Sequence, residues 1–150
     1  MKALIAPFAS LTLAGCLAFV APDDPVTTRE LVAARARWNL QGAANYTMRG
    51  SAQCFCVHGG REVEIDVAGG RVTRVRLADT GAPVPTEIGA SYRSVEELFD
   101  MVDEAIRTGA HRIEVSYDAQ RGFPTQLWID WSDRVADEEY GFRTTAVTDR

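Results

Sequence analysis

Residues 94–109, SVEELFDMVDEAIRTG, carry the clearest structural signal in this chain of 150 residues. Ser94 and Glu97 have the spacing of a capping box, and Gly109 is suited to end a helix. The apolar residues between them recur at intervals of three and four, which places them on one helix face: Val95, Leu98, Phe99, Val102 and Ile106. The segment therefore predicts an amphipathic helix that covers an apolar surface.

A second helix with the same design is expected nearer the N-terminus. Thr27 and Glu30 have capping-box spacing, and Gly42 lies as far beyond Thr27 as Gly109 lies beyond Ser94. The residues expected to share its buried face are Leu31, Ala34 and Trp38.

Alternating apolar residues follow each helix and are typical of half-buried strands. Gly69 and Gly70 suit a two-residue hairpin turn, because glycine takes positive φ without strain. In the strand after this turn, Thr73, Val75 and Leu77 are expected on one face. A later strand is expected to face the core with Phe123, Thr125, Leu127, Ile129 and Trp131. The predicted strands cover 46–57, 62–67, 71–77, 113–117, 123–131 and 141–147.

The predicted order is α-β-β-β-α-β-β-β, with a Pro/Gly-rich connection at 79–93. We expect an α+β fold in which an antiparallel sheet of about six strands carries both helices on one face. Residues 27–150 would form this single domain. The halves 27–78 and 94–148 are a possible repeat, because 70–77 and 122–129 align without a gap.

The N-terminus has the features of an export signal. Lys2 precedes an apolar run from 3 to 14, which is too short to span a bilayer as a helix. The sequence Leu13-Ala14-Gly15-Cys16 resembles the lipobox of bacterial lipoprotein precursors. That resemblance implies cleavage of a signal peptide at 1–15 and lipid attachment to Cys16, with 16–26 as a tether. A plain signal peptide with Cys16 incidental is the alternative.

This interpretation predicts an exported protein anchored to a membrane by its lipid, on the periplasmic face of the outer membrane in a Gram-negative cell. Two or more acyl chains give lasting attachment where one does not. The formal net charge of −5 argues against a nucleic-acid partner, which would need basic residues to neutralise phosphates.

With Cys16 lipidated, Cys54 and Cys56 remain, and an even number in an exported protein favours a disulfide. On a regular strand their Cα atoms would lie about 6.5–7 Å apart, so a kink would be needed. A redox-responsive thiol pair stays possible. A third interpretation is a Zn²⁺ or Cu(I) site that adds His58, if the chain folds back at Gly59-Gly60.

Other candidate chemistry is sparse. His58 and His111 are the only histidines, and no familiar catalytic motif occurs, so we expect neither catalytic residues nor a cofactor. The acidic run at 130–139 lacks the ligand order of an EF-hand, which favours a solvated loop over a Ca²⁺ site. Arg74 and Arg76 could serve an interface with Trp128, but pairing with neighbouring acids is favoured.

A set of short motifs also occurs in a characteristic order: Trp38, Asn45-Tyr46-Thr47, Cys54-Phe55-Cys56, Ser94-Val95-Glu96-Glu97, Val115-Ser116-Tyr117-Asp118, Gly122-Phe123-Pro124-Thr125 and Ala136-Asp137-Glu138-Glu139-Tyr140-Gly141-Phe142. Over about 31–147 the chain resembles the bacterial "domain of unknown function 6174" family of small exported proteins and lipoproteins. The family carries no assigned activity. The layout is also similar to PepSY and lactamase-inhibitor modules, many of which bind other proteins, a likeness of fold alone.

These observations lead to two hypotheses about function. The first is a non-enzymatic, lipid-anchored module that binds a protein partner in the cell envelope. The second is a metal- or redox-responsive envelope protein that uses Cys54, Cys56 and His58.

Overall fold

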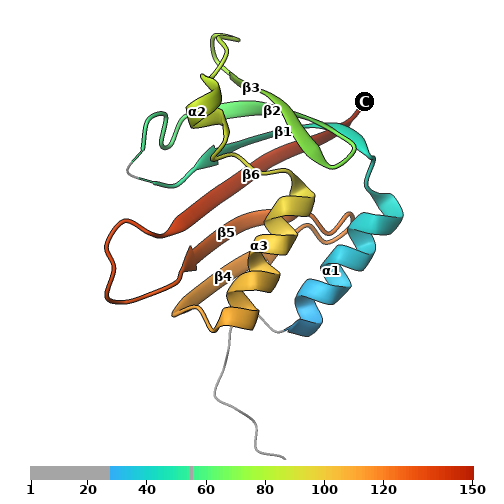
Figure 1. Ribbon diagram of the computed structural model, residues 1–150. Helices are drawn as coiled ribbons and strands as arrows, with labels where there is room; N and C mark the ends of the chain where they lie inside the picture. Colours follow the sequence, from blue (N-terminus) through green and yellow to red (C-terminus); the bar gives the residue numbers. More distant parts are fainter. Residues whose placement is uncertain (1–27, 55) are drawn as a thin grey trace, which may run out of the picture.

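The computed structural model describes residues 28–54 and 56–150, and its strands form one antiparallel sheet (Figure 1). Apart from the short helix α2, the elements within these residues follow the order expected from the sequence: α1 (Thr28–Gln41), β1 (Asn45–Ala52), β2 (Glu62–Ala68), β3 (Arg71–Leu77), α2 (Thr86–Gly89), α3 (Val95–Thr108), β4 (Arg112–Tyr117), β5 (Pro124–Asp130) and β6 (Tyr140–Asp149). The strand order across the sheet is β3-β2-β1-β6-β5-β4, so β3 and β4 are its edges.

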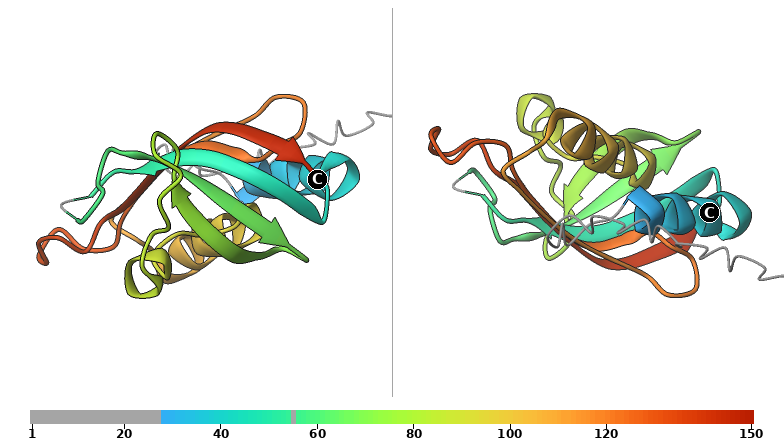
Figure 2. Two further views of the ribbon diagram at one scale, coloured as in Figure 1. Left: turned by 90° about the horizontal axis from the view of Figure 1, so that it is seen from above. Right: turned by 90° about the horizontal axis from the view of Figure 1, so that it is seen from below.

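The two long helices pack on one face of a strongly twisted sheet (Figure 2). The apolar stripe of α3 is buried as its periodicity predicts, except that Ile106 is only partly covered. α1 buries Leu31, Ala34 and Trp38. Each large apolar side chain removed from water in this way stabilises the fold by about 1.5–3 kcal/mol. The α+β arrangement expected from the sequence is confirmed.

A capping box begins α3 and also joins the helix to the β2–β3 hairpin. The Ser94 hydroxyl accepts a hydrogen bond from the Glu97 amide, and the Glu97 carboxylate accepts one from the Ser94 amide. The same hydroxyl donates to the carbonyl of Gly70, 2.7 Å away. Gly69 and Gly70 both have positive φ, as the hairpin turn requires. The start of α3 is thus held at one end of β3.

A polar contact inside the core ties both long helices to β1. Glu96 of α3 accepts hydrogen bonds from the Trp38 indole at 2.9 Å and from the Tyr46 hydroxyl at 2.6 Å. The Tyr46 oxygen in turn accepts the amide of Val95. Burial, reinforced by the Glu96 carboxylate, raises the pKa of Tyr46 well above its ordinary range. The Tyr46 hydroxyl therefore keeps its proton and donates it in the hydrogen bond to the Glu96 carboxylate.

The structure corrects several sequence expectations. β1 ends at Ala52, before the cysteines, because the following residues form a turn in which Gly60 donates its amide to the Ala52 carbonyl. Thr73 and Thr125 do not share the apolar faces assigned to them, because each is the extra residue of a β-bulge. Their hydroxyls instead donate to the backbone carbonyls of Asp66 and Ser116. The short helix α2 was not expected within the 79–93 connection.

Candidate functional site

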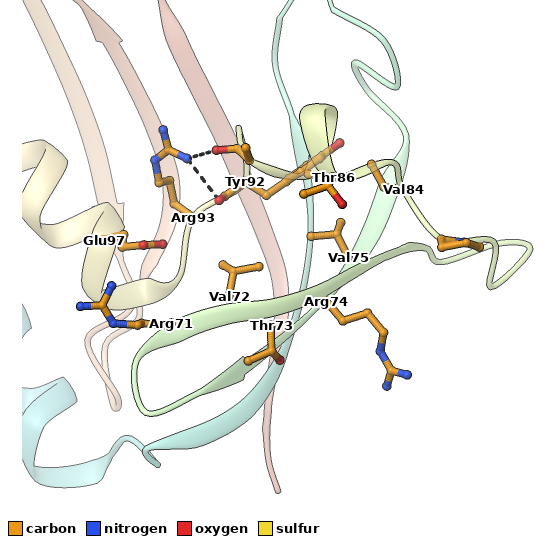
Figure 3. Close-up of a pocket in the computed structure, with 13 residues that line it drawn as sticks. Arg71, Val72, Thr73, Arg74, Val75, Val84, Thr86, Tyr92, Arg93 and Glu97 are labelled. Atoms are coloured by element: carbon orange, nitrogen blue, oxygen red, sulfur yellow. Dashed lines mark hydrogen bonds between the residues drawn. The ribbon is translucent and has the colours of Figure 1, made fainter.

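A cleft of about 470 Å³ lies beside β3, one of the two edge strands of the sheet. Residues 71–75 form one wall, and residues between Pro83 and Arg93, together with Glu97, form the other. We call this feature the β3 cleft. In Figure 3 the side chains of Val72 and Val75 lie across the cleft from Tyr92 and Arg93. Its volume falls within the range of small-molecule and cofactor pockets.

The middle of the β3 cleft is apolar and well packed. Val75, Val84 and Tyr92 are 6%, 8% and 3% exposed, so their positions are fixed by the core behind them. The Tyr92 ring also packs edge-on against Phe142 of β6, with ring centroids 6.4 Å apart. The apolar floor of the cleft is therefore fixed in position, although these three side chains expose only a small area each.

Positive charge gathers where the β3 cleft meets the start of α3. Arg93 donates to the backbone carbonyls of Ala90 and Tyr92, which fixes the direction of its guanidinium (Figure 3). Neither Arg71 nor Arg93 is recorded in an ion pair with another described residue. Among the described residues that line the cleft, Glu97 is the one acid, and its carboxylate accepts a hydrogen bond from the Ser94 amide. Two guanidinium groups here face one carboxylate, so this end of the cleft carries a net positive charge and is suited to a negatively charged group.

Two buried tyrosine hydroxyls near the cleft, those of Tyr92 and Tyr140, have no hydrogen-bond partner among the described residues. Burial raises the pKa of both phenols, and for Tyr140 the nearby Tyr92 and Glu97 add to the shift while Arg93 opposes it. Both groups stay protonated near neutral pH. An unpaired buried hydroxyl costs about 1–3 kcal/mol, so each would gain from a bound acceptor or water.

The opposite face of the same strands carries a charge cluster that is satisfied internally. The Asp66 side chain, 4% exposed, pairs with Arg74 at 2.6 Å, with Arg150 at 3.2 Å and with Arg76 at 3.6 Å. Arg76 also pairs with Glu64. Figure 3 shows Arg74 pointing away from the β3 cleft. Arg74 and Arg76 thus pair with neighbouring acids, as the sequence favoured.

Cys54 and Cys56 are joined by a disulfide, with their Cα atoms 5.2 Å apart. The kink expected from the sequence is present, since the pair lies in the turn after β1 rather than on a strand. Both cysteines are exposed. They border a shallow hollow whose apolar lining includes Val57 and Ile88 of α2.

Comparison with known proteins places this architecture in a family. Residues 30–149 match the model described as "Family of unknown function (DUF6174)". The chain belongs to this family. No curated protein and no solved structure matches it significantly. The DUF6174 match spans the whole sheet and both long helices apart from the first two residues of α1, so it includes the residues that line the β3 cleft.

The other candidate residues of this DUF6174 protein are not gathered into a site. In the part of the chain that is described, no group of three or more His, Cys, Asp and Glu residues could hold a metal ion. His58 has a positive φ in the turn after β1. Within the acidic run, Asp130 and Glu138 both accept the Ser132 amide, which orders the loop. Cys16, the signal peptide and the tether lie outside the described residues.

Of the residues that line the β3 cleft, the sequence had suggested Arg74 alone for an interface, and Arg74 points away from the cleft. Arg71 and Val72 belong to an ordinary hairpin pattern, and Tyr92 and Arg93 close the connection at 79–93. The available signal was that connection itself, because a Pro/Gly-rich stretch between two regular elements is where binding residues often lie.

Among the described helices, none is long and apolar enough to cross a membrane.

Proposed function

We propose that this DUF6174 protein is a lipid-anchored, non-enzymatic module of the cell envelope that binds a partner at the β3 cleft. The observation that carries the proposal is the cleft itself, where apolar side chains meet the guanidinium groups of Arg71 and Arg93, neither of which forms an ion pair with another described residue. Arginine and aromatic residues beside a desolvated apolar surface are the usual composition of binding hot spots.

A site-specific photo-crosslinker tests the proposed site. Thr86 is exposed and lines the β3 cleft, whereas Ser116 is exposed on β4 at the opposite edge of the sheet. Each is replaced in turn by benzoyl-phenylalanine in the full chain, and cells are irradiated. We expect a discrete adduct from position 86 and none from position 116. No adduct from position 86, or the same adduct from both positions, would contradict the proposal.

The lipid anchor is supported by the lipobox-like Leu13-Ala14-Gly15-Cys16 and is tested separately. Cells fed labelled palmitate should incorporate the label into the wild-type protein and not into Cys16→Ala. Globomycin should cause a heavier precursor to accumulate. An unlabelled wild-type protein would show that the export signal is a plain one.

The exposed Cys54–Cys56 disulfide favours a second candidate function, a redox-responsive envelope protein. A dithiol that reached the exposed sulfurs would leave the two cysteines as thiols and itself become a disulfide. Thiol titration of protein taken directly from cells, together with elemental analysis, tests this function and its metal-binding variant. A metal-free protein that always lacks free thiols would eliminate both.

A further inference from the structure

The edge of β3 already accepts an extended segment over part of its length. Residues 79–85, which we call the strap, return antiparallel to β3 and form an isolated bridge between Arg76 and Pro83. The Val84 amide donates to the Val75 carbonyl at 3.0 Å, and the Leu77 amide donates to the Ala82 carbonyl at 2.9 Å. The strap therefore behaves as a short seventh strand on the outer side of β3.

The strap leaves β3 halfway along. After Pro85 the chain turns into α2, and no backbone hydrogen bond from the strap to residues 71–74 is recorded within the described chain. Those four residues lie on the edge strand and form a wall of the β3 cleft. An edge strand with an open side is a template for a further strand.

The strap, which pairs antiparallel with β3, indicates the direction in which such a strand would run along β3. A segment that continued the line of the strap would run antiparallel to β3, from the level of Val75 towards Arg71. Its C-terminal end would then arrive where Arg71 and Arg93 line the cleft beside the start of α3. Its side chains would alternate, so that every second one entered the apolar middle formed by Val72, Val75 and Val84.

We propose that the β3 cleft binds the C-terminal end of an extended peptide, which adds to β3 as an antiparallel strand and places its terminal carboxylate beside Arg71 and Arg93. The proposal rests on the proposed function and names the partner's chemistry. Main-chain hydrogen bonds would supply affinity, the valine-lined middle would select apolar side chains, and the two guanidinium groups would select a free carboxylate.

The test compares the same peptide with and without its terminal charge. The full mature chain, purified from membranes in detergent, selects from random hexapeptides displayed on phage with free C-termini. Enriched sequences are synthesised as the free acid and as the amide. We expect the amide to bind about tenfold more weakly or worse, a loss typical of a charge-assisted hydrogen bond.

Arg71→Ala should weaken binding of the free-acid peptide by a similar factor and leave binding of the amide peptide unchanged. The substitution and the amide remove the same interaction between guanidinium and carboxylate. Arg112→Ala, on the opposite edge strand, is the matched control and should change neither. Hydrogen exchange should slow at residues 71–75 when peptide binds, and not along β4. Equal binding of acid and amide, or protection along β4, would overturn the proposal.

Failure of this inference can be told apart from failure of the proposed function. If no peptide is enriched but position 86 still crosslinks a partner, the cleft is a binding site whose occupant is not a peptide terminus. If position 86 also gives no adduct, both proposals are wrong.

Discussion

Asp66 is a nearly buried carboxylate that holds together three arginines from β3 and the chain terminus. We expect Asp66→Asn to lower the free energy of unfolding at pH 7 by about 1–3 kcal/mol, because the arginines lose their counter-charge but are partly exposed. Urea denaturation measures the change. Asp103→Asn, on the exposed side of α3, is the control and should have little effect.

The same cluster gives acid stability a definite sign. Burial acts to raise the pKa of Asp66, but Arg74 and Thr47 together hold it below the ordinary 3.8. The hydrogen bond from Arg49 similarly lowers the pKa of Glu64 from 4.5. As pH falls, the unfolded chain therefore takes up these protons at a higher pH than the folded chain does. The stabilisation is complete above the ordinary pKa values of the two carboxyls and is lost as pH falls through their pKa values in the folded state. Asp66→Asn should lose less stability than the wild type below about pH 4. If the free energy of unfolding fell equally steeply with pH in the variant and the wild type, this prediction would be wrong.

All four tyrosines of the chain have a raised pKa, in each case chiefly because the phenol is buried. A raised pKa keeps the folded state protonated, so its contribution to stability is complete below the ordinary 10.0 and declines as pH rises above it. We expect the native protein to show no tyrosinate absorbance on passing pH 10, and the urea-unfolded chain to titrate normally. Early ionisation of even one phenol would show an exposed tyrosine.

Among the elements, α3 begins at a cap that also ties the helix to the β2–β3 turn. Ser94 is fully buried and links the first turn of α3 to the Gly70 carbonyl. We expect Ser94→Ala to lower the free energy of unfolding by about 1–2 kcal/mol, the usual range for a lost N-cap. Ser116→Ala, an exposed serine on β4, is the control. A loss no larger than that of the control would mean that the cap contributes little.

The elements also show which features a sequence pattern can predict. The apolar stripe and cap of α3 and the glycine turn between β2 and β3 each depend on residues close together in the sequence. The sequence pattern therefore predicted them. The bulges at Thr73 and Thr125 depend on register against a neighbouring strand, which periodicity does not encode. These two threonines occupy equivalent positions in the ungapped alignment of 70–77 with 122–129, and the duplication stays a hypothesis.

At the scale of the whole molecule, the candidate site is a product of strand order. β3 is an edge because the second set of strands joins the sheet at β1, and the connection to α3 must then pass along that edge. From the sequence, Val75 was expected on the core face of its strand, and Val72, Arg71 and Arg93 were assigned no role in a site. Only the tertiary arrangement puts them around one cleft, so the Pro/Gly-rich connection at 79–93 could point to a binding region but not to these residues.

The arrangement also predicts how the cleft is presented by an anchored protein. The β3 cleft lies near α2 and the start of α3. The described chain begins at the first residue of α1, which lies at the other end of the molecule from α2 (Figure 1). A lipid tether that enters at that end should leave the cleft open to the envelope. We expect a Thr86→Cys variant to react with a membrane-impermeant maleimide at the same rate whether the protein is anchored or released by adding Cys16→Ala. The unsubstituted protein measures background labelling. Much slower labelling of the anchored form would mean that the membrane covers the cleft, and a partner would then have to reach it from the lipid side.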